Sequence, residues 1–185
     1  MLTEPFGHYR IGRRRLLQLT TAGTLATLAP RVLAHQGVPE RSLSLHNLQT
    51  DERLKAVYWA EGHYIPSELE AINYLLRDFR TEEVMEIDPE LLDLLYALRT
   101  SVDSKASYYV ISGYRSPETN AMLAEHIARV AKHSYHIVGK AVDVRLPGRE
   151  LEQIRRAALA LKRGGVGSYA SSDYLHLDTG PVRSW

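Results

Sequence analysis

Hydrophobic and polar residues alternate near residue 45 and predict a β-hairpin. Residues 42–46 follow a period of two, and a second apolar run covers residues 54–64. The polar residues 48–52 between these runs are typical of a turn, so the runs predict two antiparallel strands. We expect this hairpin to form a flap at the edge of a domain.

Two longer runs place their apolar residues at helical spacing. The first covers residues 66–79 and the second covers residues 89–98, and both begin with proline. Proline is favoured in the first turn of a helix, where its missing N–H would have no intrahelical partner in any case. Each run therefore predicts an amphipathic helix.

The second half of the chain alternates short strands with helices. Its strand candidates are short runs of β-branched and aromatic residues, and its helix candidates carry apolar residues at a period of 3.6. No internal repeat interrupts this order. The predicted strands cover residues 108–111, 141–144, 165–169 and 175–177, and the predicted helices cover residues 117–130 and 149–163.

The N-terminal residues have the composition of an export signal. Arg13, Arg14 and Arg15 precede two leucines, residues 19–30 are uncharged and moderately apolar, and the segment ends in small residues at Ala34. This order is typical of a signal peptide, and consecutive arginines before leucines favour the twin-arginine pathway. The alternative, an amphipathic core helix, requires a polar face at helical spacing, which this segment lacks.

This interpretation divides the chain into three parts. Residues 1–34 form a twin-arginine signal peptide, residues 35–41 form a polar linker, and residues 42–185 form one catalytic domain. The apolar stretch is too short to span a bilayer. We therefore expect an exported, periplasmic protein with no transmembrane segment in the mature chain.

Composition and charge narrow the function further. With 44% hydrophobic and 24% charged residues, the 185-residue chain matches an ordinary globular protein. Its formal charge is +1, but removal of residues 1–34 leaves 18 basic and 21 acidic residues, so no basic patch indicates nucleic-acid binding. The absence of cysteine excludes disulfides and thiolate metal sites. A bound metal would therefore use histidine and carboxylate ligands.

Two histidines and an aspartate stand where neighbouring strands would bring them together. Asp143 lies within the apolar run 141–144, and His176 lies within the run 175–177, while His136 precedes the first run. Side chains alternate across a strand and adjacent strands lie about 4.8 Å apart, so Asp143 and His176 can reach one ion. Two histidines and a carboxylate are the ligands of a catalytic zinc site with an open position for water. We therefore predict a hydrolase with one Zn²⁺ bound by His136, Asp143 and His176.

Other polar residues nearby have the chemistry that such a site needs. Asp173 precedes His176 by three residues and is the candidate general base and acid. Arg115 follows a predicted strand and is the candidate cation for developing negative charge or for a substrate carboxylate. Asp178 shares a strand face with His176 and is expected to orient a ligand histidine, with capping of the strand end as an equal alternative.

Alternative roles remain open for several of these residues. Asp143 could instead be the buried ion-pair partner of Arg115 or Lys140, and Arg115 could be a structural clamp. His133 stands three residues before His136 and could replace it as a metal ligand.

Three tyrosines adjoin the candidate site in the sequence. Tyr114 and Tyr174 are predicted to bind substrate by lining a groove, and Tyr135 is a further candidate. Ordinary half-buried packing is the alternative for each of them.

The motifs around these residues resemble those of a known family, the zinc-dependent peptidoglycan peptidases of the M15 clan. The resemblance is greatest to the murein endopeptidase K-like branch and covers the chain from about residue 42 to residue 185. It rests on Ser134-x-His136-x-x-Gly139-x-Ala141-x-Asp143, on Asp173-x-x-His176-x-Asp178, and on Ser112-Gly113-Tyr114-Arg115-Ser116.

The resemblance implies a fold and a ligand set. It implies an α+β fold with a central antiparallel sheet flanked by helices, like that of Hedgehog and DD-peptidase domains. It also implies zinc on His136, Asp143 and His176, with Asp173 and Arg115 as catalytic helpers. Some relatives have Glu in place of Asp173, which gives a longer reach toward the water.

An exported zinc enzyme of this family would have peptidoglycan as its partner. We expect an endopeptidase that hydrolyses amide bonds in the peptide cross-links, either between D-Ala and a diamino acid or between two diamino acids. A D,D-carboxypeptidase is the alternative; it would need a second fixed cation for the terminal carboxylate, and the sequence suggests none beside Arg115. A non-catalytic, zinc-stabilised wall-binding module is the alternative from another class.

Overall fold

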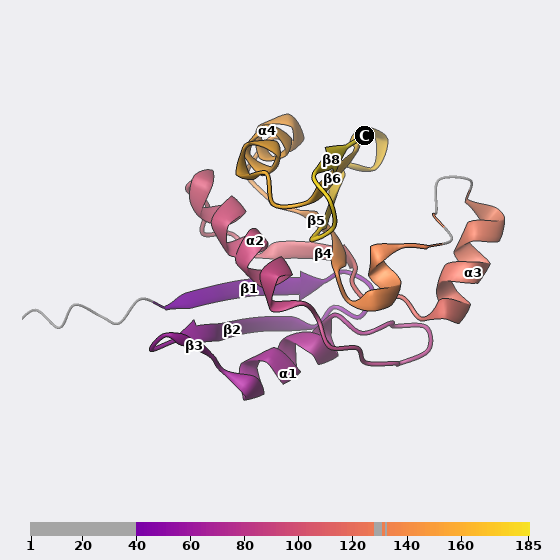
Figure 1. The fold of residues 1–185 in the computed structure, drawn as a ribbon, viewed down its shortest axis with the longest axis horizontal. Coiled ribbons are helices and arrows are strands. Elements are labelled where there is room, and N and C mark those ends of the chain that lie inside the picture. The colour runs from indigo at the N-terminus through magenta and orange to yellow at the C-terminus, as the bar shows by residue number, and fades with distance from the viewer. Residues whose placement is uncertain (1–39, 128–130, 132) are drawn as a thin grey trace, which may run out of the picture. The chain divides into compact units, whose positions relative to one another are not determined.

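The strands of the chain form one mixed sheet in the computed structural model, which describes residues 40–127, 131 and 133–185 (Figure 1). Within these residues the sheet has eight strands in the order β3-β2-β1-β4-β5-β7-β6-β8. The strands are β1 (Arg41–Asn47), β2 (Arg53–Ala60), β3 (His63–Tyr64), β4 (Tyr108–Ser112), β5 (Ala141–Arg145), β6 (Gly165–Tyr169), β7 (Tyr174–Asp178) and β8 (Arg183–Ser184).

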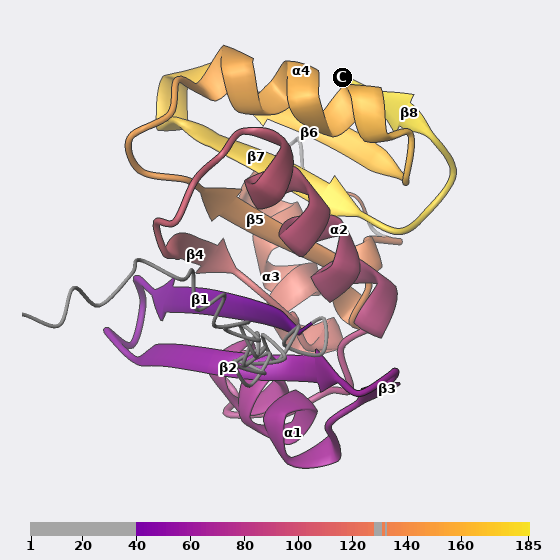
Figure 2. The ribbon, with the colours of Figure 1, turned by 90° about the vertical axis from the view of Figure 1, so that its left-hand side faces the viewer.

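Four helices accompany the sheet in the described residues, and three of them begin with proline as predicted. Figures 1 and 2 show α2 and α4 on one face of the sheet and α3 on the other. Asp88 caps α2 by accepting from the Glu90 N–H, and Ser116 caps α3 by accepting from the Thr119 N–H. The helices are α1 (Pro66–Leu75), α2 (Pro89–Ser101), α3 (Pro117–His126) and α4 (Leu151–Leu161), with 3₁₀ turns η1 (Tyr135–Val138) and η2 (Ala170–Ser172).

The predicted N-terminal hairpin is confirmed, but it is not a flap. β1 and β2 pair in antiparallel fashion, and β1 also pairs in parallel with β4. Leu43 and Tyr58 are completely buried in the core of the sheet. The hairpin therefore extends the central sheet, because its inward-facing residues supply much of the apolar surface that α1 and α2 cover.

The central strands carry the predicted antiparallel order and confirm the α+β class. β4, β5, β7 and β6 pair antiparallel in that sequence, and parallel pairing occurs at β1–β4 and β6–β8. In β5, Val142 and Val144 join the core, whereas Asp143 faces the opposite side. Asp143 is paired directly with His176 of β7. The alternation of side chains along two neighbouring strands thus brings a carboxylate and an imidazole to one place.

The remaining sequence predictions concern a membrane span, the signal peptide with its linker, and the end of helix α3. The described residues belong to one compact unit, and none of their helices is long and apolar enough to cross a membrane. The predicted signal peptide, residues 1–34, lies outside the described residues, as does most of the linker. Helix α3 ends at His126, before the predicted end at Val130, which also lies outside them.

Candidate metal centre

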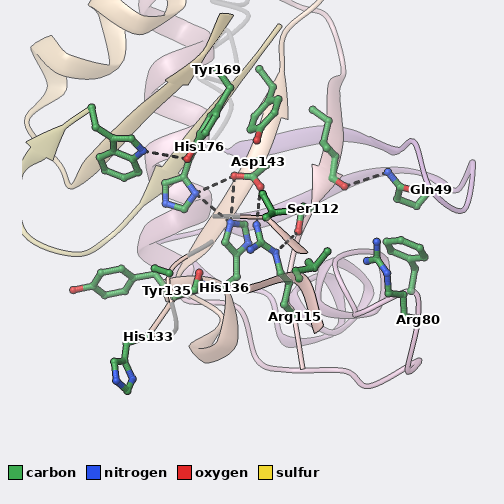
Figure 3. Close-up of a pocket in the computed structure, with 18 of the residues that line it drawn as sticks. Gln49, Arg80, Ser112, Arg115, His133, Tyr135, His136, Asp143, Tyr169 and His176 are labelled. Atoms are coloured by element: carbon green, nitrogen blue, oxygen red, sulfur yellow. Dashed lines mark hydrogen bonds and ion pairs between the residues drawn. The ribbon is translucent and has the colours of Figure 1, made fainter. Parts of the chain in front are cut away.

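His136, Asp143 and His176 meet at the floor of a cavity (Figure 3). His136 comes from turn η1, Asp143 from the middle of β5, and His176 from the middle of β7. Asp143 Oδ1 lies 3.2 Å from His136 Nε2 and 2.9 Å from His176 Nδ1, and the two nitrogens lie 3.2 Å apart. The structure thus brings together the three residues that were predicted as ligands.

The hydrogen-bond partners of the two imidazole rings determine which nitrogen carries the proton. His136 Nδ1 lies 2.6 Å from the carbonyl oxygen of Gly113, which only accepts, so Nδ1 carries the hydrogen. His176 Nε2 lies 2.9 Å from Asp178 Oδ2 and donates to that carboxylate. In each neutral ring the other nitrogen is an acceptor, and both of these nitrogens face Asp143 Oδ1. When both rings are neutral, three acceptors therefore meet with no hydrogen between them.

A metal ion fits this arrangement. Three acceptor atoms at 2.9 to 3.2 Å repel one another unless a metal ion or a proton lies among them. Tetrahedral bonds of about 2.1 Å to zinc would place ligand atoms about 3.4 Å apart, close to these distances. In residues 40–127, 131 and 133–185, this trio is the one cluster of three or more metal-ligating side chains. The donor set suits an ion that prefers nitrogen and oxygen ligands and keeps one position open.

Burial and charge favour a cation at the trio. Burial lowers the pKa of His136 and so keeps its ring neutral. Burial alone would raise the pKa of Asp143, but the facing rings of His136 and His176 hold that pKa well below its ordinary value. Burial also opposes charge on His176, but hydrogen bonds to Asp143 and Asp178 raise its pKa overall. Two ionised carboxylates therefore bracket His176, and positive charge is stabilised between them.

Arg115 contacts the other oxygen of the same aspartate. Its Nη2 donates to Asp143 Oδ2 at 2.8 Å, and its Nε donates to Ser112 Oγ at 2.9 Å. The backbone N–H of Arg115 also donates to the carbonyl oxygen of His136 at 3.2 Å. The ion-pair alternative for Asp143 thus holds together with the metal-ligand geometry, since each carboxylate oxygen has different partners. Lys140, the other proposed partner, lies 3.9 Å from Asp88 instead.

Asp178 lies behind His176 and is completely buried. Its Oδ2 accepts from His176 Nε2, and its Oδ1 accepts from the Gly180 N–H at 2.8 Å. Both predicted roles, orientation of the histidine and capping of the strand end, are therefore present in the geometry. Burial alone would raise the pKa of Asp178, but hydrogen bonds from His176 and Arg183 hold that pKa well below its ordinary value.

The cavity above the trio has a volume of about 670 Å³, large enough for a peptide fragment. One wall is aromatic, with Tyr174 stacked on Tyr169 at a ring-centroid distance of 4.6 Å. The structure thus places the predicted groove residues Tyr174 and Tyr135 on the cavity lining. The aromatic lining residues are Phe79, Tyr135, Tyr169, Tyr174 and Trp185, and the aliphatic ones include Ile111, Leu123 and Ile127.

Asp173 does not lie over the trio, where the sequence prediction placed it. Its side chain is 61% exposed, is absent from the cavity lining, and forms an ion pair with Arg145 Nε at 2.9 Å. Its backbone is left-handed, with φ 51° and ψ 53°, as the turn from η2 into β7 requires. Asp is one of the few non-glycine residues that adopt this conformation readily. The turn therefore explains why an aspartate suits position 173. A catalytic role for Asp173 stays a prediction.

Two other sequence candidates also lie away from the trio. Tyr114 is only 5% exposed, donates to Glu83 Oε2 at 3.3 Å, and is absent from the lining of the large cavity, so the packing alternative describes it. His133 lies at the rim, and Figure 3 shows its ring directed away from the trio. It therefore does not take the place of His136.

The lining residues missed in the sequence include Arg80, Arg183 and Trp185. Arg80 follows the end of a helix in a polar segment, and the last two lie beyond the final predicted strand. No periodicity marks either segment, because β8 has two residues and its partner strand is set by tertiary contacts. An arginine or tryptophan in an irregular segment gives no signal of the cavity that it lines.

Known proteins with similar sequences are described as peptidoglycan endopeptidases. The family model described as peptidoglycan L,D-endopeptidase MepK matches residues 35–185. The peptidoglycan L,D-endopeptidase MepK of Escherichia coli K12 is 41% identical over 175 residues, which cover 94% of this chain and 96% of that protein. The probable peptidoglycan L,D-endopeptidase MepK of Haemophilus influenzae is 41% identical over 163 residues, which cover 87% and 88%.

No solved structure matches the chain significantly. The family match extends over most of the sequence and includes every residue of the trio. The chain therefore belongs to the peptidoglycan L,D-endopeptidase MepK family of M15 peptidases.

Proposed function

We propose that this chain is an exported, zinc-dependent endopeptidase that hydrolyses amide bonds in the peptide cross-links of peptidoglycan. The observation that supports it most is the trio itself. His136 Nε2, Asp143 Oδ1 and His176 Nδ1 converge as three acceptors at the floor of a peptide-sized cavity. Membership of an endopeptidase family supports hydrolysis of an amide bond as the reaction at these three residues.

His136, Asp143 and His176 would hold one zinc ion. When bound, zinc in such a site supplies a Lewis acid for the substrate carbonyl and lowers the pKa of water to about 7. Asp178 keeps the hydrogen of His176 on Nε2 and thereby leaves Nδ1 free to bind the ion. The carbonyl of Gly113 does the same for His136 by accepting from Nδ1.

Arg115 is proposed to bind the substrate oxygen at which negative charge develops. Its Nε and Nη2 already have acceptors, but its Nη1 has none among the described residues, and the side chain lines the cavity. A guanidinium has five N–H donors in a fixed plane, so Arg115 can hold Asp143 and still donate to substrate. Its contact with Asp143 Oδ2 keeps the donating group close to the ligand set.

The name of the relatives favours one of the two bonds considered from the sequence. Both relatives are called L,D-endopeptidases. A bond between two diamino acids can join the L centre of one residue to the D centre of the next, whereas D-Ala linked to a diamino acid joins two D centres. We therefore propose cleavage between two diamino acids.

The cavity also bears on the carboxypeptidase alternative. The sequence argument against it was the lack of a second cation, but Arg80 lines the same cavity as Arg115 (Figure 3). The guanidinium of Arg80 rests 4.2 Å from the ring centroid of Phe79 and has no carboxylate partner among the described residues. The number of cations in the cavity therefore does not distinguish a carboxypeptidase from an endopeptidase. Membership of the family favours the endopeptidase.

The site of action follows from the substrate. Peptidoglycan lies outside the cytoplasmic membrane, so the enzyme must be exported to meet it. The arginine-rich N-terminus, with its short apolar region, supports export through the twin-arginine pathway and action in the periplasm.

Digestion of purified sacculi tests the proposal. Protein spanning residues 35–185 is incubated with sacculi, with zinc or with a chelator, and the muropeptides are identified by mass spectrometry. Loss of cross-linked dimers joined through two diamino acids, in the zinc sample alone, is the expected result. Release of D-Ala would indicate the carboxypeptidase, and unchanged muropeptides together with retained wall binding would indicate a non-catalytic binding module.

A further inference from the structure

The residues after β7 fold back and contact Asp178 and His176 at the candidate metal centre. Strand β8 pairs in parallel with β6, and the chain then places Trp185 against Val166 through a backbone hydrogen bond. Arg183, in β8, donates from Nη2 to Asp178 Oδ2 at 2.7 Å and from Nη1 to Asp178 Oδ1 at 3.0 Å. This is a bidentate pair between a guanidinium and a completely buried carboxylate.

The same carboxylate oxygen joins Arg183 to the trio. Asp178 Oδ2 accepts both from Arg183 Nη2 and from His176 Nε2. Guanidinium, carboxylate and imidazole thus form one chain of hydrogen bonds that ends at His176 Nδ1, the predicted ligand atom. The two hydrogen bonds from Arg183 therefore fix the position of the carboxylate that His176 contacts.

Aromatic rings hold the guanidinium in place. Arg183 Cζ lies 5.1 Å from the ring centroid of Tyr135 and 5.0 Å from that of Trp185. Trp185 in turn lies 5.3 Å from the ring of His176 and donates from Nε1 to the Tyr169 hydroxyl at 3.1 Å. Arg183 is therefore fixed between two rings that also line the cavity.

Three glycines leave room for this packing. A Cβ at Gly165 would collide with the Asp178 carboxylate and with Arg183, and one at Gly180 would collide with Tyr135. A Cβ at Gly167 would lie 2.6 Å from the ring of Trp185. None of these glycines has a positive φ, so close approach of side chains is what requires them. These glycines thus allow the C-terminal residues to pack against the candidate metal centre.

We propose that Arg183 is a positioning residue for the metal ligand His176 and acts through Asp178. Arg183 holds the Asp178 carboxylate in place by two hydrogen bonds, and Asp178 Oδ2 accepts from His176 Nε2 and so fixes the orientation of the ring. The Nδ1 lone pair then points toward the other two ligands. The inference rests on the proposed metal site, and it assigns Arg183 no contact with substrate or with the ion.

The test compares metal affinity in single and double variants of the full mature chain. The variants are Arg183→Gln, Arg183→Lys, Asp178→Asn, the double variant Arg183→Gln with Asp178→Asn, and the control Arg156→Gln on an exposed part of α4. Zinc dissociation constants are measured by competition with a chromophoric chelator, and kcat/KM is measured on cross-linked muropeptides. Circular dichroism establishes that each variant is folded.

Arg183→Gln is expected to weaken zinc binding roughly tenfold or more, as changes behind a ligand histidine do. Arg183→Lys should lie between Arg183→Gln and wild type, because it keeps the charge and loses the bidentate geometry. In the Asp178→Asn background, Arg183→Gln should add less than about threefold, since its route to His176 is already lost. The Arg156→Gln control should match wild type.

Two results would overturn the inference. One is wild-type zinc affinity in folded Arg183→Gln, or in Arg183→Lys if the glutamine variant does not fold. The other is a full additional loss from Arg183→Gln in the Asp178→Asn background, which would mean that Arg183 acts by another route. If wild-type protein itself neither binds zinc nor cleaves muropeptides, the proposed function fails instead, so the two failures are distinguishable.

Discussion

Asp143 and His176 occupy directly paired positions on two adjacent antiparallel strands, with Oδ1 and Nδ1 2.9 Å apart. The pairing register therefore brings a carboxylate and an imidazole side by side. A slip of one residue between β5 and β7 would leave the two side chains on opposite faces of the sheet. The candidate metal centre thus depends on strand register as much as on the identity of its ligands.

Asp143→Asn is expected to abolish hydrolysis and to weaken zinc binding at least 100-fold. The amide keeps the shape of the side chain but removes the negative charge that offsets the metal ion and Arg115. Metal content by mass spectrometry and kcat/KM on muropeptides measure both effects. Asp103→Asn, an exposed change of the same type, should leave both at wild-type values.

Arg115→Lys should lower kcat/KM roughly 100-fold while it weakens zinc binding less than tenfold. Lysine keeps a positive charge near Asp143 but cannot donate to Ser112, Asp143 and substrate at once. Steady-state kinetics and zinc titration on the same preparation separate the two effects. Equal losses in both measurements would show that Arg115 is only a structural clamp for Asp143.

Asp173→Asn is expected to retain kcat/KM within about threefold of wild type, because an exposed ion pair contributes little. Asparagine also adopts the left-handed conformation that residue 173 has. Kinetics on muropeptides with zinc-loaded protein measure the effect. A loss of 100-fold or more with zinc still bound would instead support the general-base role predicted from the sequence.

Gly139→Ala should destabilise the protein by about 3 kcal/mol or more, through both backbone strain and a collision. Gly139 has φ 67°, and a Cβ there would collide with the carbonyl oxygen of Glu86. Gly148→Ala is the matched control, since Gly148 has φ 76° but open space around it, so it should cost only about 1 kcal/mol. Urea denaturation of both variants gives the two free energies of unfolding.

The stability of the wild-type protein should fall in acid partly through Asp78. Burial alone would raise the pKa of Asp78, but hydrogen bonds from Thr119, Arg80 and Ser116 hold that pKa below its ordinary value. A carboxyl group whose pKa is lower in the folded state stabilises fully above the unfolded pKa of about 4 and loses that effect as pH falls through the folded pKa. Protonation therefore removes the contribution at low pH.

Asp78→Asn should consequently be less stable than wild type by about 2 kcal/mol at pH 7, and the difference should shrink below pH 4. Urea denaturation at pH 7 and at pH 3 measures this difference. Asp103→Asn again serves as the control, with no difference expected at either pH. A gap that stays constant with pH would mean that the lost hydrogen bonds, rather than the charge, account for the effect.

The regular elements and the three converging residues were predictable because each carries a local signal. Proline marks the first turn of three helices, and alternation in β5 and β7 identifies which side chains leave the core. The prediction of His136 depended on the sequence motif as well, because this residue lies in a 3₁₀ turn with no periodicity.

Other features depend on contacts that a single sequence does not reveal. The parallel pairing of β1 with β4 joins residues about 60 positions apart, and nothing in the alternation of β1 specifies that partner. Asp173 was placed by counting three residues back from His176, but it has a left-handed backbone itself, and its side chain pairs with Arg145. Tyr114 was assigned to the groove beside Arg115, but its ring packs in the core and its hydroxyl donates to Glu83.

Two hydrogen bonds link the segment of Arg115 to His136, one from the imidazole to the carbonyl of Gly113 and one from the Arg115 N–H to the carbonyl of His136. The backbone at Arg115 and the ring of His136, the proposed substrate-binding cation and the first proposed metal ligand, are therefore joined at two points. Substrate peptides of different width would then be accommodated elsewhere on the cavity lining, which includes Tyr169, Tyr174 and Trp185, and not between Arg115 and His136.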